Sequence, residues 1–238
     1  MNLKKPKFWN YRKPNILAYF LLPLSFFLQL LQSLRKRRRK KFKMKVICVG
    51  NIYIGGTGKT SLCIKINELL NKKNIKSCFI KKYYTDQIDE QKILQNRGKL
   101  FVSNTRVEAI NEAELKGYNV AILDDGLQDQ SIMHDLSFVC FNTINWIGNG
   151  LTIPSGPLRE NIKNIKNFKD VFFIGNLENL ETITEKIKKI NPSVNIHIGE
   201  YIPRNINEFS VNEKYIIFSG IGNHDTFVSM VKKNRLNI

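Results

Sequence analysis

A glycine-rich turn between a predicted strand and a predicted helix limits the possible folds of this chain more than any other segment. The apolar run Lys45–Val49 ends in Gly50-Asn51 and is typical of a buried strand. The turn ends in Gly55-Gly56-Thr57-Gly58-Lys59-Thr60, and apolar residues then fall on one face of a predicted helix. Strand, turn and helix in this order are the context of a phosphate-binding loop, or P-loop. The pattern predicts an α/β domain that binds a nucleotide.

The residues of this loop suit the chemistry of phosphate binding. Backbone N–H groups of residues 55–58 can close around phosphate oxygens at the start of a helix, where the helix dipole favours anions. Lys59 can reach the β- and γ-phosphates, and the Thr60 hydroxyl can ligate Mg²⁺. The strict pattern has glycine where this chain has Tyr53, so a chance glycine-rich turn is the alternative. ATP and Mg²⁺ are the expected cofactors.

A second acidic signal follows another apolar run. Asn119–Leu123 reads as a strand and ends in Asp124-Asp125-Gly126. P-loop enzymes hold the Mg²⁺ of MgATP with a carboxylate at the end of a neighbouring strand. We therefore expect Asp124 and Asp125, together with Thr60, to form the metal site. The alternative is a simple turn, because Asp-Gly is a common turn pair.

The positive charge of the chain is concentrated at its N-terminus. Of the 38 Lys and Arg residues, 16 lie within residues 1–67, which contain no Asp or Glu. The other 22 are balanced by 20 acidic residues, which leaves the body of the protein close to neutral at +2. The basic character is therefore a property of one terminal segment.

That segment also contains an apolar run, residues 16–31, followed by the basic block 35–41. The run is shorter than the ~20 apolar residues of a spanning helix. We expect residues ~8–34 to form a membrane helix that either spans marginally or lies in the interface, with the basic block on anionic headgroups. The excess of basic residues after the run places the body in the cytoplasm. The alternatives for this segment are a basic arm that binds nucleic acid and a core helix of a soluble fold. We prefer the membrane helix and expect no nucleic acid as a partner.

Apolar runs and helical patterns alternate along the rest of the chain. This alternation predicts a P-loop NTPase-like α/β fold, with a mainly parallel sheet and helices on both faces. Four single cysteines without a C-x-x-C pair are expected to be buried thiols. Strands are expected at about 45–50, 77–80, 100–103, 119–123, 137–141, 171–174, 195–198 and 214–219, and helices at about 59–72, 105–116, 178–190 and 225–235.

Four segments form a recognisable set: Val49–Thr60, Asp124–Gln128, Gly148–Gly150 with Ile153–Glu160, and Ser219–Asn223. Together they resemble the tetraacyldisaccharide 4'-kinase family, the lipid A kinases of Gram-negative bacteria. Their order and spacing fit over nearly the whole chain, and the Pro-x-Gly-Pro-Leu-Arg-Glu run is the most specific.

The resemblance implies transfer of the γ-phosphoryl group of ATP to the 4'-hydroxyl of a tetraacyldisaccharide 1-phosphate in lipid A biosynthesis. It implies an enzyme anchored by its N-terminal helix at the cytoplasmic face of the bacterial inner membrane. Asp89 matches the base that receives the acceptor proton, and Arg106 matches an arginine that holds the substrate phosphate. Gln128 matches a residue beside the metal. The remaining substrate-side positions are Asn149, Arg159 and Glu160.

The chain also departs from the family pattern. Lys81 replaces an arginine, and Asp129 stands where histidine is usual. The resemblance implies an N-terminal segment at 1–42, a kinase core at 43–212 and the start of a shortened C-terminal lobe at 213–238. A membrane-bound regulatory ATPase, or a nucleotide-binding remnant without kinase activity, are the alternative functions.

Overall fold

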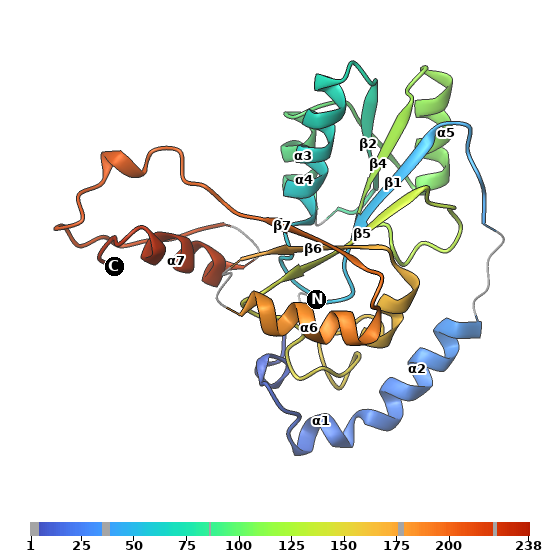
Figure 1. The fold of residues 1–238 in the computed structure, drawn as a ribbon. Helices are drawn as coiled ribbons and strands as arrows, with labels where there is room; N and C mark the ends of the chain where they lie inside the picture. The colour runs from blue at the N-terminus through green and yellow to red at the C-terminus, as the bar shows by residue number, and fades with distance from the viewer. Residues whose placement is uncertain (1–4, 35–38, 86, 176–178, 221–222) are drawn as a thin grey trace. The chain divides into compact units, whose positions relative to one another are not determined.

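The structure, a computed structural model, describes residues 5–34, 39–85, 87–175, 179–220 and 223–238. It contains a seven-stranded sheet with flanking helices, which confirms the predicted α/β fold (Figure 1). Seven of the eight predicted strands are found at their expected places, with small shifts at the ends. They are β1 Lys45–Gly50, β2 Ser77–Lys82, β3 Leu100–Ser103, β4 Val120–Asp124, β5 Leu136–Asn142, β6 Asp170–Ile174 and β7 Asn195–Gly199.

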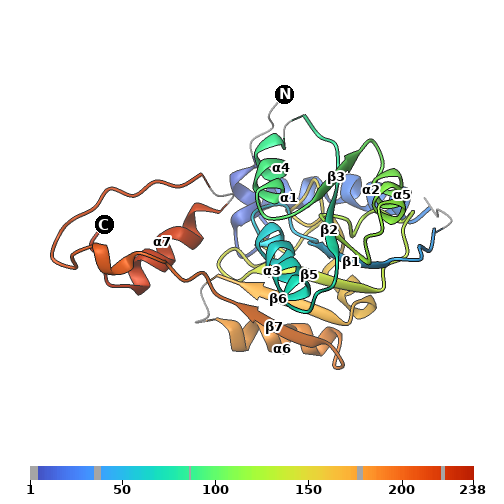
Figure 2. The same cartoon turned by 90° about the horizontal axis from the view of Figure 1, so that it is seen from above.

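The strand order is β3-β2-β4-β1-β5-β6-β7. Pairs β1–β4, β1–β5, β2–β3, β2–β4 and β6–β7 are parallel. The chain moves in one direction from β1 through β2 to β3, and then reverses to reach β4. Because parallel crossovers are right-handed, α3 (Lys59–Lys72) and α4 (Ile88–Gln95) cover one face and α5 (Arg106–Leu115) covers the other (Figures 1 and 2). Ligands bind at the carboxyl ends of strands where the direction reverses.

Local sequence explains why some helices were predicted and one was not. Helix α5 begins with a capping box, in which Thr105 and Glu108 bond each other's backbone N–H groups. Helix α4 has only eight residues, and Gln87 before it makes no side-chain cap bond. Short helices without a cap leave little trace in a sequence, so the expected helices omitted α4.

The chain divides into two compact units. The central unit comprises residues 31–51 and 58–139, and its core is built from buried apolar side chains of β1, β2, β4 and α5, such as Cys48, Ile80 and Ile110. The terminal unit comprises residues 1–30, 52–57 and 140–238. All four cysteines are buried thiols, as expected.

The terminal unit has its own apolar core. The rings of Phe141, Trp146 and Phe173 pack together, with Phe141 5.0 Å from Trp146 and 6.0 Å from Phe173 between centroids. Helix α6 (Leu180–Ile190) buries Ile183 and Ile187 and contacts the 3₁₀ helix Ile162–Asn167. A last helix, α7, covers His224–Lys233.

Two short helices stand where one membrane helix was expected. A 3₁₀ turn at Lys7–Asn10 precedes α1 (Ile16–Phe20) and α2 (Leu22–Leu34). The break has a physical reason: Pro23 has no N–H to donate to the carbonyl four residues earlier, but it is tolerated in the first turn of a new helix. Among the described residues, no helix combines the length and apolarity needed to cross a membrane. Residues 35–38 of the basic block lie outside the described ranges.

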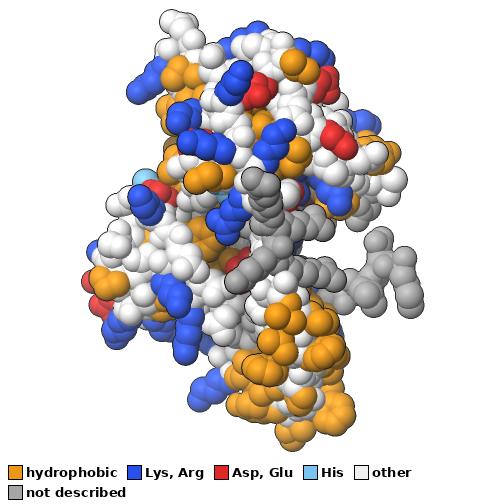
Figure 3. Space-filling model, turned by 90° about the vertical axis from the view of Figure 1, so that its right-hand side faces the viewer, with side chains coloured by type: hydrophobic (Ala, Val, Ile, Leu, Met, Phe, Trp, Pro, Cys, Tyr) orange, Lys and Arg blue, Asp and Glu red, His pale blue; other side chains and the backbone are white. Residues whose placement is uncertain are grey.

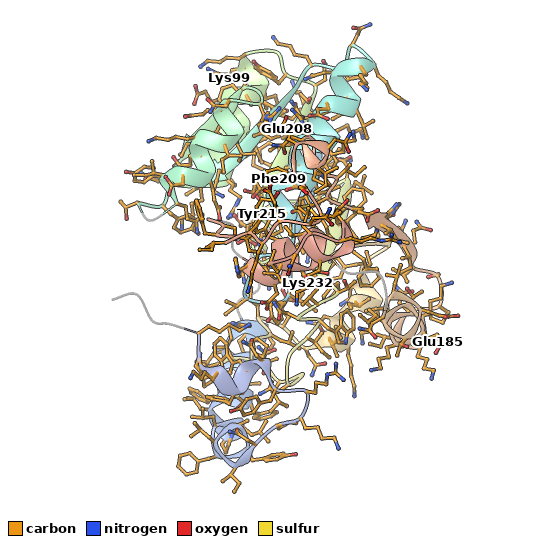
Figure 4. The ribbon with its side chains drawn as sticks, turned by 90° about the vertical axis from the view of Figure 1, so that its left-hand side faces the viewer. Lys99, Glu185, Glu208, Phe209, Tyr215 and Lys232 are labelled. Carbon is orange, nitrogen blue, oxygen red and sulfur yellow. The ribbon has the colours of Figure 1, made fainter. Side chains whose placement is uncertain are left out.

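The strand predicted at 214–219 is wrong. The described residues there form no strand, and Lys214 makes only an isolated parallel bridge with Asn237. Nearby, Phe209 and Tyr215, both labelled in Figure 4, meet edge to face with centroids 5.5 Å apart. Ile216 and Phe218 are 97% and 88% exposed, so the apolar run that suggested a strand is not covered by a partner strand in the described structure.

Candidate active site

The phosphate loop joins β1 to α3. Gly58 adopts a left-handed conformation with φ of 76°, which glycine accepts without steric cost. Lys59 is the first residue of α3, and no acidic residue lies in the first turn of that helix. The positive end of the helix dipole at this point therefore favours an anion. The nucleotide-binding role of residues 55–60 stays a prediction.

Tyr53 explains how this loop tolerates a residue other than glycine. Its side chain is 2% exposed and lies in the terminal unit, where its hydroxyl accepts a hydrogen bond from Lys5. Burial raises the pKa of Tyr53 to about 12. Ile54 N–H donates to Pro157 O (2.9 Å), and Arg159 N–H donates to Ile52 O (2.7 Å). The backbone on both sides of Tyr53 thus fastens the start of the loop to the Pro-Ser-Gly-Pro-Leu-Arg segment, and Tyr53 forms an antiparallel bridge with Leu158.

Asp124 ends β4 beside the end of β1. The two strands are in register at Val49 and Asp124, and the Thr60 hydroxyl lies 3.3 Å from Asp124 Oδ2. The structure therefore brings together two of the three predicted metal ligands. Mg²⁺ prefers oxygen ligands and is usually held by one or two carboxylates together with substrate phosphates, so these side chains fit it. Asp125 follows with a left-handed φ of 59°, and its N–H donates to Val49 O (2.8 Å).

A buried lysine that the sequence analysis did not place in the site contacts the same carboxylate. Lys81, near the end of β2, is 1% exposed. Its Nζ lies 2.9 Å from Asp124 Oδ2 and 2.5 Å from Glu90 Oε2. Burial alone would lower the pKa of Lys81, but the two carboxylates outweigh it and raise that pKa above its ordinary value. The ammonium therefore stays charged in an otherwise apolar interior.

The predicted base and the predicted phosphate-binding arginine lie in the first turns of two helices that are consecutive in the chain, α4 and α5. Asp89 lies in the first turn of α4 and is exposed, next to Glu90. Arg106 begins α5 and is 7% exposed. Its Nη2 donates to Asp125 O at 2.5 Å, and its Nη1 lies 3.4 Å from Asp129 Oδ2. The guanidinium is therefore engaged with the segment that follows β4.

Asp129 takes part in a small polar cluster. Burial would raise the pKa of its carboxyl, but hydrogen bonds from the Ser131 hydroxyl and N–H and the charge of Arg106 lower it. Arg106 Nε and His134 Nε2 are buried without a hydrogen-bond partner in the central unit as described. The position where histidine was expected thus carries a carboxylate that neutralises Arg106.

The substrate-side residues expected from the resemblance lie in different settings. Gln128 is exposed, and its Nε2 donates to Asn51 O (3.0 Å). Asn149 is buried, donates to Ser155 O (2.9 Å) and accepts from Leu151 N–H (3.1 Å), so it shapes its own loop. Arg159 and Glu160 are partly exposed, and Glu160 accepts a hydrogen bond from Asn164 (3.1 Å).

Helix α1 buries Ala18, whereas α2 is packed with polar side chains inward. The buried residue of α2 is Ser25, whose hydroxyl lies 2.9 Å from Thr152 O and 2.8 Å from Ser155 Oγ. Gln29, one turn later, donates to Arg159 O (3.2 Å). Large apolar side chains point outward instead, and Figure 3 shows hydrophobic groups gathered on this N-terminal segment. The exposed ones are Ile16, Leu17, Tyr19, Phe20, Leu22, Leu24, Phe26, Phe27, Leu30, Leu31 and Leu34.

Comparisons with known proteins agree on one family. Residues 17–238 match the family model described as LpxK, tetraacyldisaccharide-1-P 4'-kinase. The tetraacyldisaccharide 4'-kinase of Pelagibacter ubique (strain HTCC1062) is 58% identical over 239 residues, which cover 100% of this chain and 76% of that protein. The enzyme of the same name from Rickettsia canadensis (strain McKiel) is 32% identical over 256 residues, with the same two coverages.

A solved structure has the same fold. LpxK from Aquifex aeolicus, crystallised in complex with ATP, aligns with a TM-score of 0.56 over 87% of each chain at 18% identity. At this identity the likeness concerns the fold alone.

Proposed function

Because this chain belongs to the tetraacyldisaccharide 4'-kinase family, we propose that it transfers the γ-phosphoryl group of ATP to the 4'-hydroxyl of a tetraacyldisaccharide 1-phosphate. One observation of the structure carries the phosphoryl-transfer part of the proposal: Thr60 Oγ1 lies 3.3 Å from Asp124 Oδ2 at the end of the phosphate loop. A hydroxyl and a carboxylate in this relation are the protein ligands of MgATP in P-loop enzymes. The identity of the acceptor, a tetraacyldisaccharide 1-phosphate, is inferred from the family.

The residues of the loop act by position and charge. Backbone N–H groups from Gly55 to Lys59 hold the phosphates, and the Lys59 ammonium lies at the start of α3 to neutralise charge that develops on the γ-phosphoryl group. Thr60 and Asp124 would hold Mg²⁺, with Asp125 as the third proposed ligand. The cation would supply positive charge that offsets the charge of the phosphates.

Asp89 is the proposed base. It is exposed at the start of α4, where an acceptor hydroxyl can approach it. Since phosphoryl transfer has a loose transition state, this carboxylate mainly orients the hydroxyl and takes its proton late. Its position relative to the phosphate loop therefore matters more than its basicity.

Arg106 is the proposed partner of the substrate phosphate. Its contact with the Asp125 carbonyl fixes the orientation of the guanidinium, while the longer contact with Asp129 leaves one edge that an incoming phosphate can compete for. Gln128, Arg159 and Glu160 are proposed to contact the polar part of the substrate. Asn149 is proposed to act on that substrate through the shape of its loop, because its side chain is buried.

The N-terminal helices are proposed to lie on the cytoplasmic surface of the inner membrane. Their outward apolar side chains suit the interface between headgroups and acyl chains, and basic residues on either side of the helices suit anionic lipids. Such a location gives the enzyme access to a substrate whose acyl chains keep it in the bilayer. The proposed partners are therefore an acylated disaccharide phosphate and an anionic membrane.

Transfer of ³²P from γ-labelled ATP to a tetraacyldisaccharide 1-phosphate in detergent micelles tests the function. Label should enter the lipid with the wild-type protein and be lost with Lys59→Ala and Asp89→Ala. Lys65→Ala is the matched control, because Lys65 is an exposed lysine on the same helix α3. ATP binding without label in the lipid would refute the kinase proposal and favour a nucleotide-binding remnant. ATP hydrolysis without lipid phosphorylation would favour the regulatory ATPase.

A further inference from the structure

Lys81 is a charged side chain placed where charges are rarely found. It belongs to β2 and is 1% exposed. The other residues of this strand are also buried or nearly buried. An isolated ammonium would be costly at this depth. Two carboxylates, Asp124 and Glu90, compensate it at 2.9 and 2.5 Å. A buried ammonium paired with two carboxylates suggests a specific role for Lys81.

The three groups connect two parts of the proposed site. Strands β2 and β4 are parallel with Ile80 opposite Leu123, so Lys81 and Asp124 come next on neighbouring strands. Asp124 Oδ2 contacts both Lys81 Nζ and Thr60 Oγ1. Glu90 belongs to the first turn of α4, immediately after Asp89. Lys81 therefore joins the carboxylate on the metal side to the turn that carries the proposed base.

That turn has little else to hold it in the described structure. Gln87 at the start of α4 gives no side-chain cap bond. Gln91 donates to Tyr84 O at 3.3 Å, and Leu94 is buried toward the other end of the helix. An uncapped helix start frays unless another contact orders it. The ion pair between Lys81 and Glu90 supplies that contact.

We propose that Lys81 is a positioning residue, which ties the first turn of α4, and with it Asp89, to Asp124 beside the phosphate loop. It acts through Glu90 and Asp124 and does not touch the substrate. The idea rests on the proposed kinase function for its effect on catalysis. Its structural part, the tether of α4, is independent of that function.

Amide hydrogen exchange of the full-length protein tests the tether directly. Lys81→Met and Glu90→Gln should each raise exchange in residues 88–95, while the capped helix α5 keeps its protection. Glu90→Gln guards against misfolding, because it leaves the buried pair of Lys81 and Asp124 intact and changes a side chain that is 51% exposed. Lys45→Met is the matched control, since Lys45 is also a strand lysine paired with an aspartate, Asp135, but its side chain is 70% exposed.

Kinetics test the consequence for catalysis. Loss of the tether should lower kcat for lipid phosphorylation roughly 100-fold in Lys81→Met and in Glu90→Gln, because small misplacements of a catalytic group have effects of this size. Lys81→Arg should recover most of the rate. The affinity for ATP should also be measured over a range of Mg²⁺ concentrations. Apparent Mg²⁺ binding should become roughly tenfold tighter in Lys81→Met alone, because Asp124 then lacks a competing cation.

The outcomes separate the two proposals. Unchanged exchange in α4 for both variants would overturn the positioning role, whatever the kinetics. Faster exchange together with an unchanged kcat would also overturn it, because the tether would then not serve Asp89. If the wild-type protein labels no lipid but both variants exchange faster in α4, the tether is supported and the kinase proposal is refuted.

Discussion

Replacing exposed aromatic residues of the N-terminal helices should weaken membrane binding by a predictable amount. Phe20 and Phe26 are 80% and 74% exposed. If about 160 Å² of each side chain can be buried, about 120 Å² of it is available, and at ~25 cal/mol per Å² complete burial contributes about 3 kcal/mol. A helix lying in the interface immerses about half of that surface. Each Phe→Ser change should then weaken binding roughly tenfold, and the double variant roughly 100-fold.

Co-sedimentation with vesicles that contain anionic lipid measures this change. Phe218→Ser is the matched control, because Phe218 is 88% exposed but lies far from these helices in the sequence. It should bind the vesicles as the wild type does. The circular dichroism of all variants should match, since the altered side chains face outward. Equal binding of wild type and double variant, or an equal loss in Phe218→Ser, would refute the interfacial reading of α1 and α2.

Three further predictions concern stability and are checked by thermal or denaturant unfolding. Gly156→Ala should lower the free energy of unfolding by about 3 kcal/mol. The reason is that the added Cβ would lie 2.1 Å from Asn149 Oδ1 and 2.4 Å from Leu151 O. An unchanged melting temperature would contradict the close packing of this loop. Thr105→Ala should cost about 1 kcal/mol through loss of the capping box, whereas Thr105→Ser should cost little. Asp129 has a lowered pKa in the folded state, so its contribution to stability is present above the ordinary value of 3.8 and is lost as pH falls through the lowered folded value. Asp129→Asn should therefore be less stable than wild type at pH 7, with a difference that shrinks below about pH 4; a difference independent of pH would be inconsistent with this ion pair.

The sequence by itself determined the fold class and the phosphate loop. Both depend on local information: β-branched runs, glycines where the backbone must turn tightly, and a Lys-Thr pair at a helix start. The pairing of Thr60 with Asp124 was also predictable, because the ends of parallel strands meet at one edge of a sheet. The strand at 214–219 failed for the converse reason. An apolar run shows that a segment is able to form a strand, but a strand also needs a neighbouring strand to bond with.

Only the tertiary structure decided which side chains surround these groups. The sequence marked Lys81 only as a replacement for a family arginine, and its burial between Asp124 and Glu90 follows from the order of β2 and β4 in the sheet. The apolar N-terminal run was visible, yet Pro23 divided it, and long-range bonds from Ser25 and Gln29 decided which face points outward. Burial and charge compensation depend on residues distant in the chain, which a local pattern does not record.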